Sequence, residues 1–331
     1  MPDRNGDRSM KNIYIKDMKT GEEITSFFMI KAIAIKVGSN RKAYLDMTLG
    51  DNTGEVTAKK WNVADEEYET LSKYSVGDVI KVRAEVKEWN KMQQLIISRI
   101  RYAAQDDGID IKDFIKAAPE DPEVMYDFIM RAIETISDAD LKKLCRYNME
   151  TNREKLMYWP AASKNHHAER SGLLWHIKRM LASGIALCGV YTNLDPDLVI
   201  AGVVLHDIEK LTEINSDEQG ISDGYSFEGL MLGHIVQGVK VLDAQMTQMG
   251  FPHEKKIMIE HMILSHHYEP EYGSPKKPLF PEAELLHYLD MMDAKMYDME
   301  EAVEMTEPGE FSQRVWTLDN RRIYRRLDDK K

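Results

Sequence analysis

Cysteine is scarce in this sequence, and long apolar runs are missing. The 331 residues include two cysteines, Cys145 and Cys188, which allow at most one disulfide and favour free thiols in a reducing compartment. No run approaches the roughly 20 apolar residues that span a bilayer. Residues 1–8 are polar and hold no apolar signal core. These absences predict a cytoplasmic protein that has no membrane partner.

Charge is spread unevenly along the chain. The net charge of −12 at first argues against a nucleic-acid partner. Residues 1–105, however, hold 18 Lys and Arg against 15 Asp and Glu, a net charge of +3, whereas the remainder carries −15. Bulk charge therefore decides nothing about partners. The length gives a prior of about two domains.

Residues 10–104 alternate between strand-like segments and turn signals. A short helix is expected over 65–74. Strands are expected over 25–37, 43–49, 55–61, 79–89 and 93–102. Five strands with a helix between the third and fourth form the topology of an OB-fold barrel. The phrase at 45–56 also resembles the hairpin between the second and third strands of nucleic-acid-binding OB domains.

OB domains bind single strands by stacking bases on aromatic side chains beside a positively charged groove. The candidates in this chain are Tyr44, Lys59, Lys60, Trp61, Arg83 and Trp89. The aromatic residues among them could instead belong to the core, and the cations could simply be solvated. Acidic residues lie between the lysines, so binding is expected to be weak, sequence-tolerant and sensitive to salt. The expected partner is single-stranded RNA, with single-stranded DNA as a further candidate.

The rest of the chain follows helical spacing. Residues 105–160 are expected to form a helical linker or support segment, with helices over 111–117, over 122–136 and after Asp138. Residues 161–310 are expected to form an all-α bundle without strands, with helices over 170–189, 196–210, 227–249, 254–267 and 281–304. Residues 311–331 form a basic tail that could contact substrate, contact a neighbouring subunit or remain solvated.

A His–Asp pair follows the apolar run 198–205. Adjacent helical residues point about 100° apart, so His206 and Asp207 can grip one ion from two sides. Burying either charge without a partner would be costly. Further candidate ligands occur in order along the chain, namely His176, His234, His266, His267 and Asp290. The order His, His-Asp, His, His-His, Asp resembles the HD superfamily of metal-dependent phosphohydrolases.

A wider resemblance covers nearly the whole chain. It rests on the phrases at 166–168, 171–176, 201–210, 229–235, 263–267, 273–275 and 286–294. In these phrases the chain resembles the YhaM family of 3′-5′ exoribonucleases, which joins an OB domain to an HD domain. The chain departs from the family at Glu209 and Ser171, where glycine is common. The resemblance implies a nuclease that releases nucleoside 5′-monophosphates.

The same resemblance implies roles for individual residues. The core metal ligands would be His176, His206, Asp207 and Asp290. His234, with His266 or His267, would complete a second metal position, and Asp293 is the reserve ligand should Asp290 point away. The catalytic set would be Asp207, reaching both metals, Lys210, holding a phosphoryl oxygen, and His166 and His167, contacting phosphate or the leaving oxygen. Lys210 could equally be a helix-terminal cation.

Mixed imidazole and carboxylate ligands suit Mn²⁺, Fe²⁺ or Zn²⁺ better than Mg²⁺ or Ca²⁺. The family implies Mn²⁺, with two ions conceivable. Two other functions stay open. One is hydrolysis of nucleotides or cyclic dinucleotides, which need no strand-binding platform. The other is a non-enzymatic single-strand-binding replication accessory factor, against which the intact ligand set speaks. The sequence also leaves homo-oligomerisation open.

Overall fold

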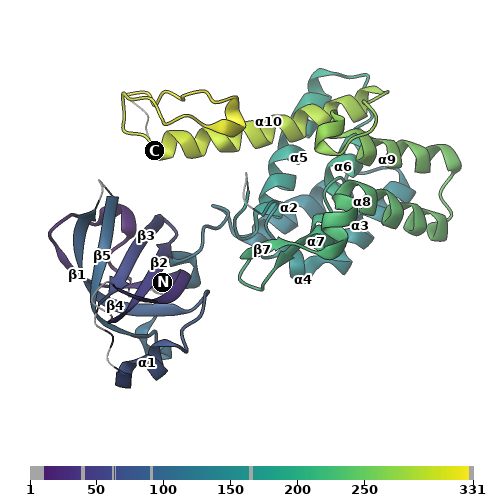
Figure 1. Ribbon diagram of the computed structural model, residues 1–331. Helices are drawn as coiled ribbons and strands as arrows, with labels where there is room; N and C mark the ends of the chain where they lie inside the picture. Colours follow the sequence, from purple (N-terminus) through teal and green to yellow (C-terminus); the bar gives the residue numbers. More distant parts are fainter. Residues whose placement is uncertain are drawn as a thin grey trace, which may run out of the picture. The chain divides into compact units, whose positions relative to one another are not determined.

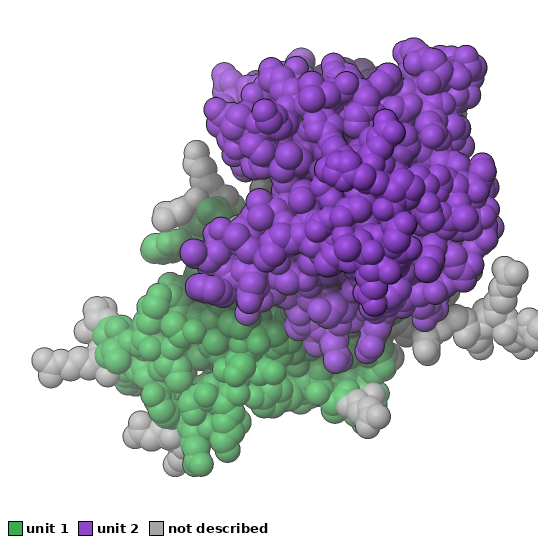
Figure 2. All heavy atoms as spheres, turned by 90° about the vertical axis from the view of Figure 1, so that its right-hand side faces the viewer, with its two compact units in different colours: residues 1–117 green, residues 118–331 purple. Residues whose placement is uncertain are grey.

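The computed structural model describes residues 11–38, 42–61, 63, 65–89, 92–163 and 167–327. The chain divides into two compact units, residues 1–117 and 118–331, which Figure 2 draws in green and purple. Residues 105–117 thus belong to the first unit. Phe114 is completely buried there, and the backbone N–H of Asn52 donates to the carbonyl of Asp113 at 2.9 Å.

The first unit is a closed five-stranded barrel (Figure 1). The strands follow the order β1-β2-β3-β5-β4, with β4 pairing back onto β1, and only the β3–β5 pair is parallel. The elements are β1 (Glu23–Val37), β2 (Ala43–Asp51), β3 (Gly54–Lys60), α1 (Asp65–Leu71), β4 (Val79–Trp89) and β5 (Met92–Tyr102), with single 3-10 turns η1 (Ile15–Asp17), η2 (Gln105–Asp107) and η3 (Ile111–Asp113). The OB topology predicted from the sequence is confirmed. The helix expected over 111–117 is only the turn η3.

Strand alternation builds the barrel core. Along β3, Val56, Ala58 and Lys60 point inward, while the residues between them face outward. At the rim, a buried ion pair joins Lys11 Nζ to Asp51 Oδ2 at 3.0 Å. The Lys11 ammonium also donates to the carbonyl of Phe27. Asp51 accepts further bonds from backbone N–H groups, so this polar pair is fully satisfied inside the apolar rim.

The second unit is a helical bundle. Its helices are α2 (Pro122–Glu134), α3 (Ala139–Thr151), α4 (Arg153–Leu156), α5 (Gly172–Val190), α6 (Pro196–Leu205), α7 (Lys210–Glu213), α8 (Phe227–Met249), α9 (His253–Ser265) and α10 (Pro281–Glu304), with 3-10 turns η4 (Pro270–Tyr272) and η5 (Trp316–Leu318). Asp121, Asp138 and Asp195 cap the N-termini of α2, α3 and α6 by accepting backbone N–H groups. The predicted architecture of a barrel followed by a helical bundle is confirmed.

The expectation that no strand follows Pro160 was wrong. A hairpin of β6 (Ile214–Ser216) and β7 (Ser222–Tyr225) connects α7 to α8. Strands of three and four residues are too short to show an alternating pattern in the sequence. The helix expected over 196–210 also ends at Leu205, and a turn over 206–209 separates it from α7.

Helix α5 is long and apolar enough to cross a bilayer by length and composition alone. This differs from the expectation that no apolar run approaches the length of a membrane span. The helix packs against α2, α6 and α10, and Leu173, Ile177 and Leu181 lie in the core of the unit. We therefore describe α5 as the central core helix of this unit.

Candidate metal centre

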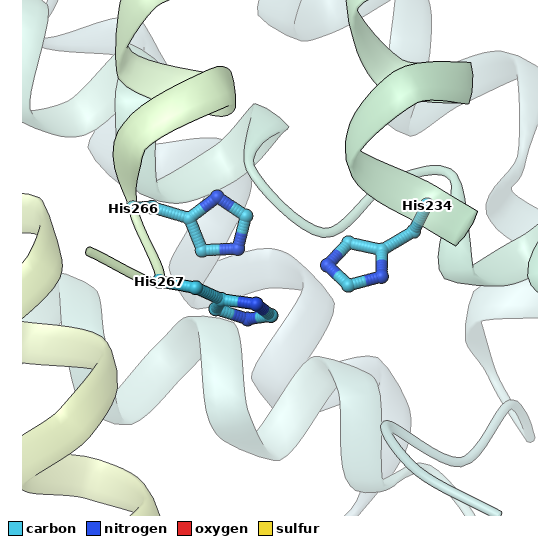
Figure 3. Close-up of side chains that lie close together, drawn as sticks. All are labelled: His234, His266 and His267. Atoms are coloured by element: carbon cyan, nitrogen blue, oxygen red, sulfur yellow. The ribbon is translucent and has the colours of Figure 1, made fainter. Parts of the chain in front are cut away.

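Five histidines and two aspartates converge inside the second unit. They come from elements far apart in the sequence: His176 from α5, His206 and Asp207 from the end of α6, His234 from α8, His266 and His267 from the end of α9, and Asp290 from α10. Figure 3 shows His234, His266 and His267 turned toward one another. The bundle thus brings together every residue that the sequence predicted as a metal ligand.

Each imidazole is held through its Nδ1 atom, which lies 2.7–3.0 Å from an oxygen that can only accept. The acceptors are the carbonyls of Val203, Ile263 and Tyr272 for His206, His266 and His267, and the carboxylates of Glu213 and Asp293 for His234 and His176. The proton of each neutral ring therefore sits on Nδ1. All five Nε2 atoms are left with a lone pair.

These lone pairs face other acceptors. His176 Nε2 lies 3.3 Å from His206 Nε2, and His234 Nε2 lies 3.3 Å from Asp207 Oδ1. Asp207 Oδ1, His234 Nε2 and His266 Nε2 are buried, and no described residue donates a hydrogen bond to them. Facing acceptors repel unless a cation lies between them, and burying them unpaired is costly. The residues present therefore fit a bound cation.

The Asp207 carboxylate lies between two groups of ligands. Its Oδ2 is 3.2 Å from His206 Nε2 and 3.6 Å from His176 Nε2. Its Oδ1 faces His234 and, at 3.8 Å, His266 Nε2. Ligand atoms cluster closely enough to hold an ion on either side, in the groups His176–His206–Asp207 and His234–His266–His267. The arrangement can accommodate two cations that share one carboxylate.

Of the two aspartates on α10, Asp290 rather than Asp293 faces the other candidate ligands. Asp290 Oδ1 lies 3.3 Å from His176 Nε2, on the ligand side of the ring. Asp293 Oδ2 accepts from the opposite nitrogen of that ring, Nδ1, at 2.8 Å, and it lies equally far from His167 Nε2. Asp293 therefore orients a ligand from behind, as carboxylates commonly do around metal-binding histidines.

Burial and neighbouring charges set the protonation states. Burial lowers the pKa of the His266 imidazole well below its usual range. For His176, burial also lowers the pKa, but the carboxylates of Asp290 and Asp293 outweigh it and raise the pKa to about 9. Burial opposes ionisation of Asp207, yet neighbouring cationic groups hold the pKa of its carboxyl well below the usual range. Metal binding requires an ionised carboxylate beside a neutral imidazole, so a cation that binds His176 must displace the second proton that Asp290 and Asp293 favour on its ring.

Glu213 is a site residue that the sequence did not single out. Its Oε1 accepts both the backbone N–H of His234, at 2.9 Å, and the ring Nδ1–H, at 3.0 Å. The backbone at Gly233 breaks α8 with a φ of 67° and a ψ of 165°, a conformation that glycine adopts readily. The two bonds from His234 to Glu213 hold the chain just after this bend. A glycine inside an apolar helix, directly before a histidine, was the available signal.

A cavity of about 480 Å³ opens onto the ligands. The Lys210 ammonium lies in its wall, 2.7 Å from Asp207 Oδ2. Burial lowers the pKa of Lys210, but Asp207 outweighs burial and raises it, so the ammonium stays charged. The main groups that line the cavity are Lys210, His234, His267 and Asp290 on the ligand side and Tyr225, Tyr272, Lys295, Asp298 and Trp316 around them.

The sequence predicts two catalytic histidines ahead of α5, His166 and His167. His166 is outside the described residues. His167 is completely buried, its ring centroid lies 4.1 Å from that of Tyr297, and it does not line the cavity. We therefore assign His167 no contact with substrate.

In the barrel, three of the predicted nucleic-acid contacts lie together. The rings of Tyr44 and Trp61 are 4.6 Å apart, and Lys59 Nζ lies 5.3 Å from the Trp61 ring centroid. Trp89 is 67% exposed near the end of β4. Lys60 and Arg83 are engaged by carboxylates instead. Lys60 points inward and binds a Glu67 oxygen at 2.8 Å, and Arg83 binds Glu23.

A barrel of OB topology and a helical bundle with a buried His–Asp cluster define an HD-type phosphohydrolase joined to an OB domain. The family of OB-fold nucleic acid binding domains matches residues 29–102, and the HD domain family matches residues 169–295. The 3′-5′ exoribonuclease YhaM of Geobacillus sp. strain WCH70 is 36% identical over 93% of this chain and 93% of its own length. The chain belongs to the YhaM family of 3′-5′ exoribonucleases.

A second relative gives the same result. YhaM of Halalkalibacterium halodurans is 36% identical over 93% of this chain and 94% of its own length. Among solved structures, the second OB-fold domain of replication protein A from Methanococcus maripaludis is 17% identical. It covers 28% of this chain and 95% of its own, with a TM-score of 0.22.

Proposed function

We infer that the protein is a metal-dependent 3′-5′ exoribonuclease that shortens single-stranded RNA and releases nucleoside 5′-monophosphates. The observation that carries this inference is the convergence of five imidazole Nε2 atoms on two carboxylates, four of them on Asp207 and that of His267 on Asp290. Two relatives named 3′-5′ exoribonuclease match this chain along almost their whole length, and this similarity supports the inference. Both cysteines are free, which supports a cytoplasmic location.

The chemistry of the donors favours Mn²⁺, with Fe²⁺ or Zn²⁺ as substitutes. His176, His206 and Asp290 would hold one ion, and His234, His266 and His267 the other, with Asp207 shared. Bound divalent ions supply Lewis-acid stabilisation of the phosphoryl group and activate water for attack. Lys210 places its ammonium at the cavity wall beside Asp207, where it can neutralise charge that builds on a phosphoryl oxygen.

The barrel supplies the strand-binding surface. Tyr44 and Trp61 offer two adjacent, mutually tilted rings with the Lys59 ammonium near both, and Trp89 offers a further exposed ring. Bases stack on such rings with little regard to sequence. We leave Lys60 out of this surface because it points into the barrel. Binding should weaken as salt rises, because cations such as Lys59 bind by releasing counterions from the phosphates.

The test is incubation of the purified protein with 5′-labelled RNA and DNA under Mn²⁺, Mg²⁺ and Zn²⁺. Stepwise shortening from the 3′ end is expected, strongest with Mn²⁺. Replacing both His206 and Asp207 by Ala should abolish it while the circular dichroism spectrum is kept. His253→Ala, an exposed histidine at the start of α9, is the matched control. Shortening by the double variant, or turnover of dNTPs or cyclic dinucleotides instead of RNA, would refute the assignment.

A further inference from the structure

The C-terminal segment folds into an irregular hairpin beside α10, as the yellow end of the chain in Figure 1 shows. Isolated bridges pair Phe311 with Tyr324 and Val315 with Arg321. The tip turns through Asp319 and Asn320, which have φ values of 58° and 57°. Asp and Asn are residue types that tolerate this conformation. The arginine-rich stretch over residues 321–326 is therefore the second arm of a folded hairpin.

Three arginines of this stretch donate hydrogen bonds to backbone carbonyls. Arg322 Nε donates to the carbonyl of Ser312 at 2.9 Å, Arg321 Nε to that of Leu318 at 2.9 Å, and Arg325 Nη1 to that of Thr306 at 2.7 Å. Leu318 is completely buried. These bonds hold the tip turn η5 in one conformation against the body of the unit.

Trp316 lies on this tip, and its side chain contributes little to the packing of the hairpin. Its side chain is 70% exposed, although an exposed tryptophan leaves a large apolar surface in water. Trp316 and Thr317 line the same cavity as His234, His267 and Asp290. The ring therefore stands at a cavity whose other side is the metal centre.

The cavity has the extent of about one nucleotide. It follows one face of α10 from Asp290 through Ala294 to Asp298, which is about 12 Å at the helical rise of 1.5 Å per residue. Its volume of about 480 Å³ is at the small end for ligand sites. A 3′ exonuclease cleaves a phosphodiester that has a single nucleotide on its 3′ side. With the scissile phosphate at the ligands, that nucleotide extends into this cavity.

We propose that Trp316 stacks on the base of the 3′-terminal nucleotide and thereby positions the scissile phosphate at the metal centre. This proposal rests on the inferred exonuclease function. Stacking on a tryptophan ring needs only the π-face that every base offers. Trp316 would therefore accept any terminal base, and it would bind purines most tightly because their faces are largest. The rigid hairpin reduces the ordering cost of binding.

The experiment compares wild type, Trp316→Ala and Trp316→Phe on two RNAs. One RNA ends in an ordinary nucleotide and the other in an abasic nucleotide. Trp316→Ala should lose roughly 5- to 150-fold in kcat/KM for the first cleavage of the ordinary RNA, mostly through KM. Trp316→Phe should recover most of this loss. Wild type and Trp316→Ala should be equal on the abasic RNA, because the pair measures one contact.

Phe311→Ala is the matched control, since Phe311 is an exposed aromatic of the same hairpin that does not line the cavity. It should match wild type on both RNAs. The stacking proposal is overturned if Trp316→Ala matches wild type on ordinary RNA, or loses the same factor on both RNAs. Anisotropy with a non-cleavable phosphorothioate RNA repeats the comparison without turnover. It therefore separates failure of the stacking from failure of the nuclease assignment.

Discussion

The two units bury polar groups in opposite ways. In the barrel, the Lys11–Asp51 pair is fully buried, and both partners are satisfied by each other and by the backbone. In the bundle, Asp207 Oδ1 and the Nε2 atoms of His234 and His266 are buried with no donor among the described residues. An unsatisfied buried polar group costs about 1–3 kcal/mol. The first arrangement serves the fold, and the second gives up stability to keep a ligand site ready.

The sharpest way to break this comparison is to replace Asp207 with Asn. We expect RNA shortening to fall at least about 10³-fold, because the shared carboxylate is lost. The metal-free protein should also lose some stability, because the Lys210 ammonium loses the carboxylate 2.7 Å away, but relief of the repulsion between acceptors should keep this loss small. Urea unfolding with chelator checks the second point. A metal-free variant much less stable than wild type would mean that the cluster is structural.

The opposite result is expected for Asp51→Ala in the barrel. Removing Asp51 leaves the buried Lys11 ammonium without this carboxylate, which should cost about 3–5 kcal/mol. Hydrogen exchange in β1 to β5 should speed up accordingly, while exchange in the bundle stays unchanged. A combined Lys11→Met and Asp51→Leu variant should recover most of this loss. Unchanged exchange in Asp51→Ala would show that the pair contributes nothing.

Glu213→Gln tests how far the ligands depend on their supports. Glutamine can keep one bond to His234 but removes the negative charge that strengthens both. Mn²⁺ affinity, measured by calorimetry, should fall about 10- to 100-fold. The thermal stabilisation that Mn²⁺ gives at a fixed concentration should shrink with it. Glu228→Gln, on the first turn of α8, is the control and should bind Mn²⁺ as wild type does.

The smallest effect concerns pH and the barrel. The bonds from Arg101 hold the pKa of the Asp107 carboxyl below its usual range. A lowered folded-state pKa contributes stability that is complete above the ordinary carboxyl pKa, about 4, and is lost progressively as pH falls from there through the folded-state pKa. Asp107→Asn should therefore cost about 1 kcal/mol at pH 7, and the difference should shrink as pH falls below about 4. A difference that stays the same between pH 7 and pH 3 would point to packing instead.

Much of the fold was predictable because local signals and tertiary structure agree. Turn residues bound each barrel strand, and the ligand histidines and aspartates keep a recognisable order. The inward direction of Lys60 was also predictable, since it continues the alternation of Val56 and Ala58. Ser171 adopts a φ of 61°, a conformation that glycine adopts more readily than serine, in keeping with the glycine that the resemblance leads one to expect there.

Other features depend on contacts that no local pattern reveals. Glu213 is one of 56 acidic residues, and its partner His234 lies 21 positions away. The choice between Asp290 and Asp293 depends on which side of the His176 ring each carboxylate meets. Trp316 lies in the basic tail, residues 311–331, which shows no helical or strand periodicity. Its position at the cavity therefore could not be predicted before the hairpin was seen.

The bonds from His206 and His266 to carbonyls three residues earlier have a mechanical consequence. Both rings follow the end of a helix, α6 or α9, where the last carbonyls lack partners within the helix. Spare acceptors of the helix ends thus clamp the rings. Fraying or a shift of register at either end would swing a donor atom away from the ion, so loss of metal should report the earliest loosening of these two helices.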